Sequence, residues 1–290
     1  MAQLKEIKSR LQSIRSTRQI TSAMMMVSSA KLKKAQQLIQ TLYPYERKMN
    51  RLLGLLLRGD EEFRSPYTLQ RSIKRVAIVA FSSNTGLAGR FNENIATRLE
   101  SVIKAYLPLG KENILLYPIG GKVAKAAGKM GLQPAGDYEG ISTKPTYQET
   151  QKIAKELMEL FLTEKIDRVE LIYHHFKSKG SQEVVQETFL PVESPSGKQN
   201  PLINDYIVEP NRAVLLQQLL PKVIQLKLFT AHIDSVTSEH AARMVAMQLA
   251  SDNADDLIDE LKSEYNKLRQ QSITNELLDI VGGSFGQTSR

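Results

Sequence analysis

The C-terminal part of the chain carries a long pattern of apolar positions that recur at steps of three and four residues. Residues 222–281 hold no proline and no glycine, and Pro221 precedes them, where proline suits a first helical turn. The spacing predicts one α-helix of about 90 Å, because each residue adds about 1.5 Å. A stripe of this length needs a partner of similar length to cover it. Its members are Leu219, Val223, Leu226, Ile233, Met244, Met247, Ala254, Ile258, Leu261, Tyr265 and Leu268.

The N-terminal part carries a second stripe, with a period close to seven over residues 3–57. One heptad position holds Leu4, Leu11, Met25, Leu32, Ile39 and Leu53, and the other holds Ile7, Ile14, Ala35, Leu42, Met49 and Leu56. A sustained seven-residue period is typical of a left-handed supercoil, so we expect the two ends of the chain to pair as antiparallel helices. The alternative is that each stripe belongs to an internal core helix. Polar residues interrupt the N-terminal stripe at Arg18, Thr21, Ser28 and Glu46.

Between these helices the pattern changes to short apolar runs that alternate with helical segments. We predict strands at Val76–Phe81, Ile114–Ile119, Val169–Phe176, Glu183–Val192 and Tyr206–Val208, and helices at Asn92–Leu107, Lys122–Met130 and Thr146–Thr163. Gly131–Lys144 and Glu193–Asn204 are expected to be loops. The alternation indicates an α/β layer with a mostly parallel sheet. The predicted division is therefore residues 1–57 for the first long helix, 58–210 for the α/β domain and 211–290 for the second long helix.

Charge is distributed unevenly between the two predicted helices. The chain has a formal net charge of +8, yet residues 1–58 carry twelve basic and two acidic side chains. Residues 252–264 contain six acidic side chains, and flanking opposite charges help to fix the register of coiled coils. The alternative is that the basic helix binds nucleic acid or an anionic membrane surface. The chain has no cysteine, which excludes disulfides and zinc–thiolate sites, and no apolar run of membrane-spanning length.

The best candidate for an enzyme-like site is FSSNTGLAGRFNENI at residues 81–95, where a buried strand leads through a glycine loop into a helix. Such junctions can hold phosphate, but Gly86 and Gly89 form GxxG, and the chain has no GxxxxGK[ST] motif. We therefore expect a tight turn with Asn92 as a helix cap, with a nucleotide-binding enzyme as the alternative. We expect no catalytic residue, no cofactor and no metal site. Adjacent His174 and His175 should face opposite sides of a strand.

Several sequence blocks closely resemble one known family, and the resemblance covers nearly the whole chain. The N-terminal block is RSTRQITSAMMMVSSAKLKKAQ at residues 15–36. The C-terminal blocks are SEHAARMVAM at 238–247, SDNA at 251–254 and YNKLRQQSITNELLDIVGG at 265–283. The segments 81–95, 169–176, 183–192 and YIVEP at 206–210 also fit in order. Together they resemble the γ subunit of the F-type ATP synthase.

The resemblance implies an antiparallel coiled coil with an inserted Rossmann-like α/β domain. It further implies a non-catalytic rotor shaft, which couples ion-driven rotation of the membrane c-subunit ring to conformational changes in the catalytic β subunits. The implied partners are the α and β subunits of the hexamer, the ε subunit and the c-ring, with one copy of this chain per complex and no nucleic acid. Met1 directly precedes the shaft helix, which favours a bacterial protein, peripheral on the cytoplasmic side of the inner membrane.

By residue-wise resemblance, Arg269, Gln270 and Thr274 match family positions that contact a loop of the β subunit. Tyr206 and Glu209 match positions near the ε subunit and the ring. An apolar tip that turns within the hexamer sleeve is expected from Ile273, Leu277, Leu278, Ile280 and Val281. The chain departs from the family at Ser22 and Met25, where a basic and a charged or polar residue are common, so no charge-based contact is expected at either position.

Overall fold

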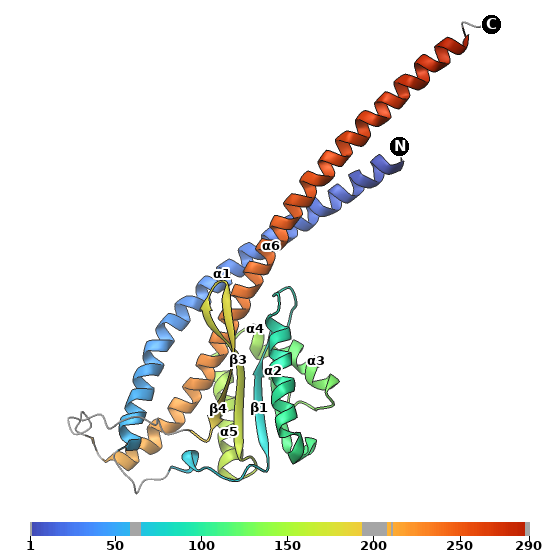
Figure 1. Cartoon of the computed structure of the whole chain (residues 1–290). Helices are drawn as coiled ribbons and strands as arrows, with labels where there is room; N and C mark the ends of the chain where they lie inside the picture. The colour runs from blue at the N-terminus through green and yellow to red at the C-terminus, as the bar shows by residue number, and fades with distance from the viewer. Residues whose placement is uncertain (1, 59–64, 193–207, 210, 288–290) are drawn as a thin grey trace. The chain divides into compact units, whose positions relative to one another are not determined.

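The computed structural model describes residues 2–58, 65–192, 208, 209 and 211–287, without the side chains of Ala2, Arg58, Asp279 and 281–287. Along the sequence, an α/β region lies between two long helices (Figure 1). The elements are α1 (Ala2–Arg58), β1 (Val76–Phe81), α2 (Phe91–Tyr106), β2 (Ile114–Ile119), α3 (Gly121–Lys129), α4 (Glu139–Thr143), α5 (Tyr147–Leu162), β3 (Arg168–Ser178), β4 (Ser181–Leu190) and α6 (Arg212–Gln287). Short 3₁₀ turns lie at Pro66–Thr68, Leu107–Leu109 and Lys111–Asn113.

The chain forms two compact units, and both long helices run through each of them. The first unit comprises Met1–Ser28 and Met244–Arg290, and the second comprises Ser29–Arg243. Each unit is described by itself below. The division at residues 57 and 210 expected from the sequence stays a prediction.

The second unit contains a four-stranded sheet in the order β2-β1-β3-β4. Strand β1 pairs in parallel with β2 and β3, whereas β3 and β4 form an antiparallel hairpin. Strand β1 is buried along its whole length, which explains why its sequence is continuously apolar rather than alternating. The predicted α/β fold with a mostly parallel sheet and long terminal helices is confirmed.

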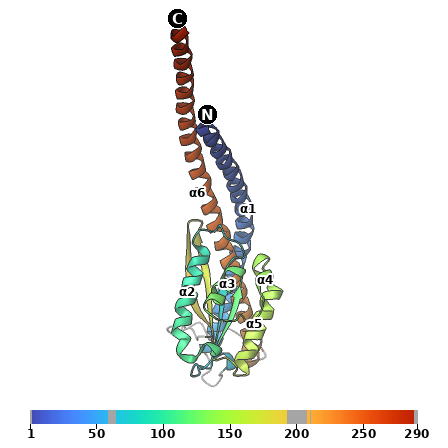
Figure 2. The same ribbon diagram turned by 90° about the vertical axis from the view of Figure 1, so that its right-hand side faces the viewer.

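Each face of the sheet packs against a different set of helices (Figure 2). Val76, Ile78 and Ala80 of β1 face α2 and α3, and they form one hydrophobic cluster with Ile95 and Leu99 of α2. The alternate residues of β1 face α5 and the two long helices. That second layer includes Leu53 and Leu56 of α1, Leu157 and Phe161 of α5, and Leu216, Leu220, Val223, Ile224 and Leu228 of α6. The heptad stripe of α1 therefore becomes part of the core of an α/β domain.

Two details of the predicted elements are wrong. Helix α6 begins at Arg212 and contains Pro221, which was expected at its start. The buried neighbours Leu220 and Val223 explain this, because their burial offsets the amide hydrogen bond that a proline inside a helix removes. Residues 131–144 were expected to be a loop but contain α4. Of the predicted strand at 206–208, Tyr206 and residue 207 lie outside the described residues, and Val208 lies in no strand.

Candidate partner-binding surface

In the first unit, α1 and α6 lie side by side and run antiparallel (Figures 1 and 2). The hydroxyls of Thr21 and Ser251 lie 2.7 Å apart in the buried seam, and Arg18 Nε lies 2.6 Å from Asp255 Oδ1. Two of the polar residues that interrupt the heptad stripe, Thr21 and Arg18, thus have partners on the opposite helix, whereas Ser28 donates to the carbonyl of Met24 on its own helix. The Arg18–Asp255 pair is about half exposed, so it contributes about 0–1 kcal/mol, chiefly to register. The predicted pairing of a basic with an acidic helix is confirmed at this position.

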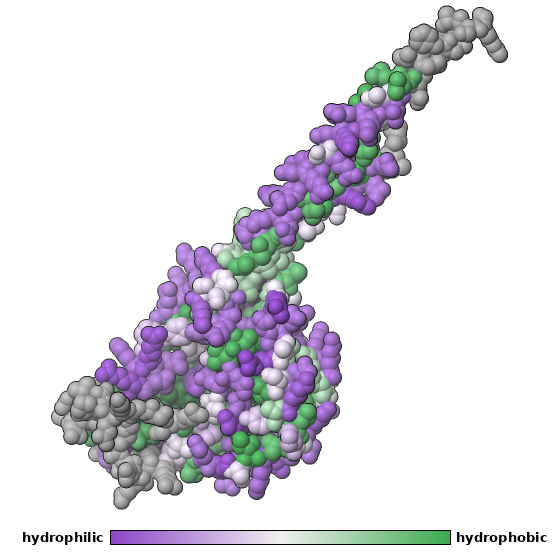
Figure 3. Space-filling model, in the orientation of Figure 1, coloured by the Kyte–Doolittle hydropathy of each residue, from purple (hydrophilic) through white to green (hydrophobic). Residues whose placement is uncertain are grey.

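Beyond this pairing, α6 is longer than its partner. Thr21 of α1 lies opposite Ser251 of α6, and the helices are antiparallel. In this register Ala2, the first residue of α1, lies opposite Gln270 and Gln271. Past that point, none of the described residues of α1 is available to cover α6. Figure 3 shows hydrophobic side chains gathered on these last described turns.

The predicted apolar tip falls in this uncovered part of α6. Ile273, Leu277, Leu278 and Ile280 are between 48% and 69% exposed. Val281 belongs to α6, but its side chain lies outside the described residues. Four large apolar side chains within two turns form a contiguous surface of the kind that marks an interaction site.

The three predicted contact residues lie at the same place on α6. Arg269, Gln270 and Thr274 are all exposed, and the Thr274 hydroxyl donates a hydrogen bond to the carbonyl of Gln270 at 2.9 Å. An exposed guanidinium presents a planar fork of donors that suits a carboxylate. The surface therefore combines an apolar stripe with a basic group at its base.

The foot residues predicted by resemblance are Tyr206 and Glu209. Tyr206 lies outside the described residues, whereas Glu209 is described and exposed. Their predicted contacts with other subunits stay predictions.

Sequence reasoning missed a second group of exposed apolar residues in the first unit. On α1 these are Ile20, Met26 and Val27, and on α6 they are Leu249 and Leu257. All are at least 46% exposed, although they lie on paired helices. The signal was present, because residues 19–30 form a stretch with no charged side chain. The apolar character of the paired helices thus extends outside their seam.

The glycine loop after β1 and the turn before α3 bind each other within the second unit. The first three amides of α3 already donate to this loop: Gly121 to Asn84 Oδ1, Lys122 to Ser83 O and Val123 to Ser82 Oγ. Gly120 has a φ of +112°, and a Cβ there would collide with the carbonyl of Ser82. These bonds occupy the N-terminus of α3, so a phosphate there would have to displace bonds that the protein makes itself.

Asn92 has a different role from the one predicted. It is the second residue of α2 rather than its cap, and its Oδ1 accepts hydrogen bonds from the amide and hydroxyl of Ser83. The same loop is bound to α6 by Arg243, which donates to Thr85 Oγ1 at 3.1 Å and to Glu239 Oε1 at 2.8 Å. The loop therefore fastens the sheet to a long helix.

His174 and His175 do face opposite sides of β3. His174 is buried and stacks on Phe91 of α2, whereas His175 binds Asp234 of α6. Among the described residues, no three His, Asp or Glu side chains are grouped as metal ligands. Within that same part of the chain, no helix combines the length and apolarity that crossing a membrane requires.

Comparison with known proteins gives a consistent result. The sequence profile of the family described as ATP synthase matches residues 3–285. The ATP synthase gamma chain of Bacteroides fragilis is 54% identical over 289 residues, covering 98% of this chain and 99% of that protein. The gamma chain of Phocaeicola vulgatus is 52% identical over 287 residues, with the same coverage.

Solved structures with the same fold come from a rotary complex. A chain of the Euglena gracilis mitochondrial ATP synthase, in a structure of OSCP/F1/c-ring in rotational state 3, matches with a TM-score of 0.64 and 18% identity. That match covers 99% of this chain and 95% of the other. A chain of the rotor of the same enzyme in rotational state 1 matches with a TM-score of 0.60, 19% identity and coverage of 94% and 99%.

Proposed function

We propose a function that proceeds from one premise: the chain belongs to the ATP synthase gamma chain family. It is a non-catalytic subunit of ATP synthase and forms part of the rotor in the central stalk. Nucleotide chemistry belongs to other subunits, which agrees with an α3 N-terminus whose first amides are bound by the loop after β1. The complex in which it works is membrane-associated, and the chain contributes to it as a shaft.

The observation that carries this function is the uncovered end of α6. Two helices pair through a seam that contains Thr21 and Ser251, and then α6 continues alone with its apolar residues exposed. Such a surface is costly in water and is stabilised when another protein surrounds it. Apolar contact is non-directional, so it permits rotation without breaking fixed hydrogen bonds.

We further propose which partners this chain contacts. The end of α6 stands inside the hexamer of α and β subunits, with one copy of the chain per complex. Residues 58–210 form the foot, which lies against the ε subunit and the c-ring, with Glu209 and Tyr206 in that contact. The complex is placed at the bacterial inner membrane, with this chain peripheral on its cytoplasmic side.

The proposed transmission of force rests on differences between the two helices. A hexamer with threefold symmetry can sense the angle of a rotor only if the rotor lacks that symmetry, and α1 and α6 present different side chains. Arg269, Gln270 and Thr274 would contact a β-subunit loop at some angles and lose it at others. A contact of this kind favours one conformation of the β subunit over another. The size of the effect is the difference in contact free energy between the two conformations, on the order of a few kcal/mol.

Reconstitution tests the proposal. The full chain is mixed with purified α and β subunits of the same organism, and the products are examined by native mass spectrometry and an ATPase assay. We expect one copy with three α and three β subunits, and ATPase activity that depends on its presence. Arg269→Ala should lower that activity, whereas Lys267→Ala, an exposed neighbour, should not. A folded chain that fails to assemble with these subunits would overturn the proposal.

A further inference from the structure

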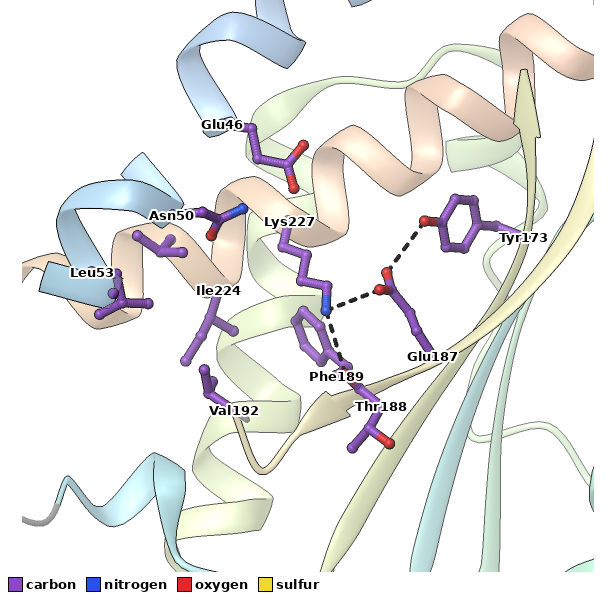
Figure 4. A pocket seen from close by; sticks show the side chains of 12 residues that line it. Glu46, Asn50, Leu53, Tyr173, Glu187, Thr188, Phe189, Val192, Ile224 and Lys227 are labelled. Carbon is purple, nitrogen blue, oxygen red and sulfur yellow. Dashed lines mark hydrogen bonds and ion pairs between the residues drawn. The ribbon is translucent and has the colours of Figure 1, made fainter. Parts of the chain in front are cut away.

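The second unit contains a cavity that the rotor function does not use. Its volume is about 400 Å³, and it lies where α1, β4 and α6 meet (Figure 4). Cavities of this size are typical of sites for small molecules. Its lining includes Glu46 and Asn50 of α1, Glu187 and Phe189 of β4, and Lys227 of α6.

The polar side of the cavity holds two carboxylates and one ammonium group. Lys227 Nζ lies 3.2 Å from Glu187 Oε2 and 3.4 Å from the carbonyl of Thr188. Tyr173 donates its hydroxyl to the other oxygen of Glu187 at 3.3 Å. Figure 4 shows Glu46 of α1 and Glu187 of β4 on either side of the Lys227 side chain. With both carboxylates ionised, the three groups carry a net charge of −1.

Glu46 is a partly buried carboxylate beside the Lys227–Glu187 ion pair. Burial raises its pKa, and the nearby Glu187 raises it further, whereas Lys227 lowers it. Removing a carboxylate from water disfavours its charged form, and a second cation beside it restores that form. The electrostatics of the cavity therefore favour a positively charged occupant over a neutral or an anionic one.

The opposite side of the cavity is apolar. Leu53 of α1, Phe189 of β4, and Val223 and Ile224 of α6 belong to the hydrophobic core and also line this space. Val192, just after β4, adds a partly buried side chain. An occupant with a hydrocarbon or aromatic body would bury apolar surface here, at about 25 cal/mol for each Å².

We propose that this cavity binds a small amphiphilic cation, namely an ammonium or guanidinium group carried on an apolar body. The cationic group lies beside Glu46, next to the Lys227–Glu187 ion pair, and the body packs against Phe189 and Ile224. Binding brings the charge of the cavity from −1 to zero. The site joins α1 to α6 through the ligand, so its occupancy stabilises the folded second unit. The proposal concerns the chain itself and does not depend on the rotor function.

Three probes with one body and different head groups test the proposal. Isothermal titration of the full chain uses 4-phenylbutylamine, 4-phenylbutanol and 4-phenylbutanoate at pH 7. We expect saturable 1:1 binding of the amine, binding of the alcohol weaker by about tenfold or more, and no binding of the carboxylate. Absence of amine binding at millimolar concentration, or equal binding of amine and alcohol, would overturn it.

Variants locate the site. Glu46→Gln and Glu187→Gln keep the side-chain shape and should each weaken binding of the amine by about tenfold or more. Glu93→Gln, an exposed glutamate on α2, is the matched control and should bind as the unchanged chain does. Asn50→Trp provides a second test that keeps all charges, because Asn50 is exposed and lines the cavity. It should block entry, and amine binding that survives both kinds of variant would place the probe elsewhere and refute the proposal.

Discussion

His175 Nδ1 of β3 lies 2.6 Å from Asp234 Oδ2 of α6. The other oxygen of the same carboxylate accepts the amide hydrogen of Phe176 at 2.7 Å. The Asp234 side chain is 3% exposed, and burial raises its pKa, although both hydrogen bonds act in the opposite direction. One buried carboxylate thus fastens the outer hairpin of the sheet to a long helix through two different donors.

Replacing Asp234 tests how much this fastening contributes. Asp234→Asn keeps the size of the side chain but offers one acceptor oxygen where two donors converge. We expect the free energy of unfolding to fall by about 1–3 kcal/mol, because one buried donor is left without its acceptor. Urea denaturation of the full chain at pH 7 measures it. Asp256→Asn on the exposed face of α6 is the control, with an expected change below about 0.5 kcal/mol. Equal stability of both variants would contradict the prediction.

Buried His174 and His232 and partly buried His240 each make a contribution to stability that is lost in mild acid. Burial lowers the pKa of His174 and His240 to about 4 and that of His232 to about 3. Below pH 6.5 the unfolded chain binds protons that the folded chain does not. Each histidine therefore removes up to about 1.4 kcal/mol for each pH unit, down to its folded pKa. Above pH 6.5 this contribution to stability is complete.

Buried carboxylates act in the opposite direction. Burial raises the pKa values of Asp234, Glu239 and Glu46, so protonation of these groups stabilises the folded chain in acid. Urea denaturation at pH 7.0 and 5.5 therefore compares the unchanged chain with His174→Leu, because the carboxylates are the same in both proteins. From pH 7.0 to 5.5 the unchanged chain should lose more stability than His174→Leu, by up to about one proton in the slope. An equal pH dependence of the two proteins would refute the interpretation.

The periodicity of the sequence was sufficient to predict the elements whose residues are buried on a regular pattern. Val76–Phe81 was recognisable as a strand because every residue in it is apolar, and the heptads of α1 predicted a paired helix. Pro221 misled the prediction, because a local rule for helix starts competed with the packing of Leu220 and Val223, which are far in sequence from the strands they cover. Local propensity cannot report such contacts.

The candidate sites were harder to predict from the sequence. The identities of Arg269, Gln270 and Thr274 came from resemblance, and the structure adds that they are exposed. The pairs His175–Asp234 and Glu187–Lys227 join residues 59 and 40 positions apart, so no spacing rule relates them. The exposed group around Met26 was signalled by an uncharged stretch, but the outward direction of its side chains depends on where α6 packs.

The register of the coiled coil can be tested at the buried hydroxyls of Thr21 and Ser251. Thr21→Val removes the nearer of two hydroxyls beside Ser251 Oγ, at 2.7 Å, and leaves that of Ser22 at 3.4 Å, so we expect the free energy of unfolding to fall by about 1 kcal/mol. Adding Ser251→Ala should recover part of this loss, because the double variant leaves no hydroxyl unsatisfied. A double-mutant cycle by urea denaturation measures the coupling, expected at about 0.5–1.5 kcal/mol. Thr17→Val, at an exposed position of α1, is the control. Strictly additive effects would show that the pair contributes nothing to the seam.

The uncovered end of α6 gives the prediction that bears most directly on function. Leu277→Ser with Leu278→Ser changes side chains that are 58% and 63% exposed, so the isolated chain should unfold as before. In the reconstituted complex the same change removes apolar surface that the proposed sleeve covers, at up to about 1.5–3 kcal/mol for each leucine. We therefore expect weaker assembly by native mass spectrometry and altered ATP-driven rotation. Glu264→Gln, a substitution nearer the N-terminus of the same helix, should leave assembly and rotation unchanged. If the double variant assembled and rotated like the unchanged chain, these leucines would have no bearing role, and the contact would have to lie on other residues of the shaft, such as the exposed apolar group at Ile20, Met26 and Val27.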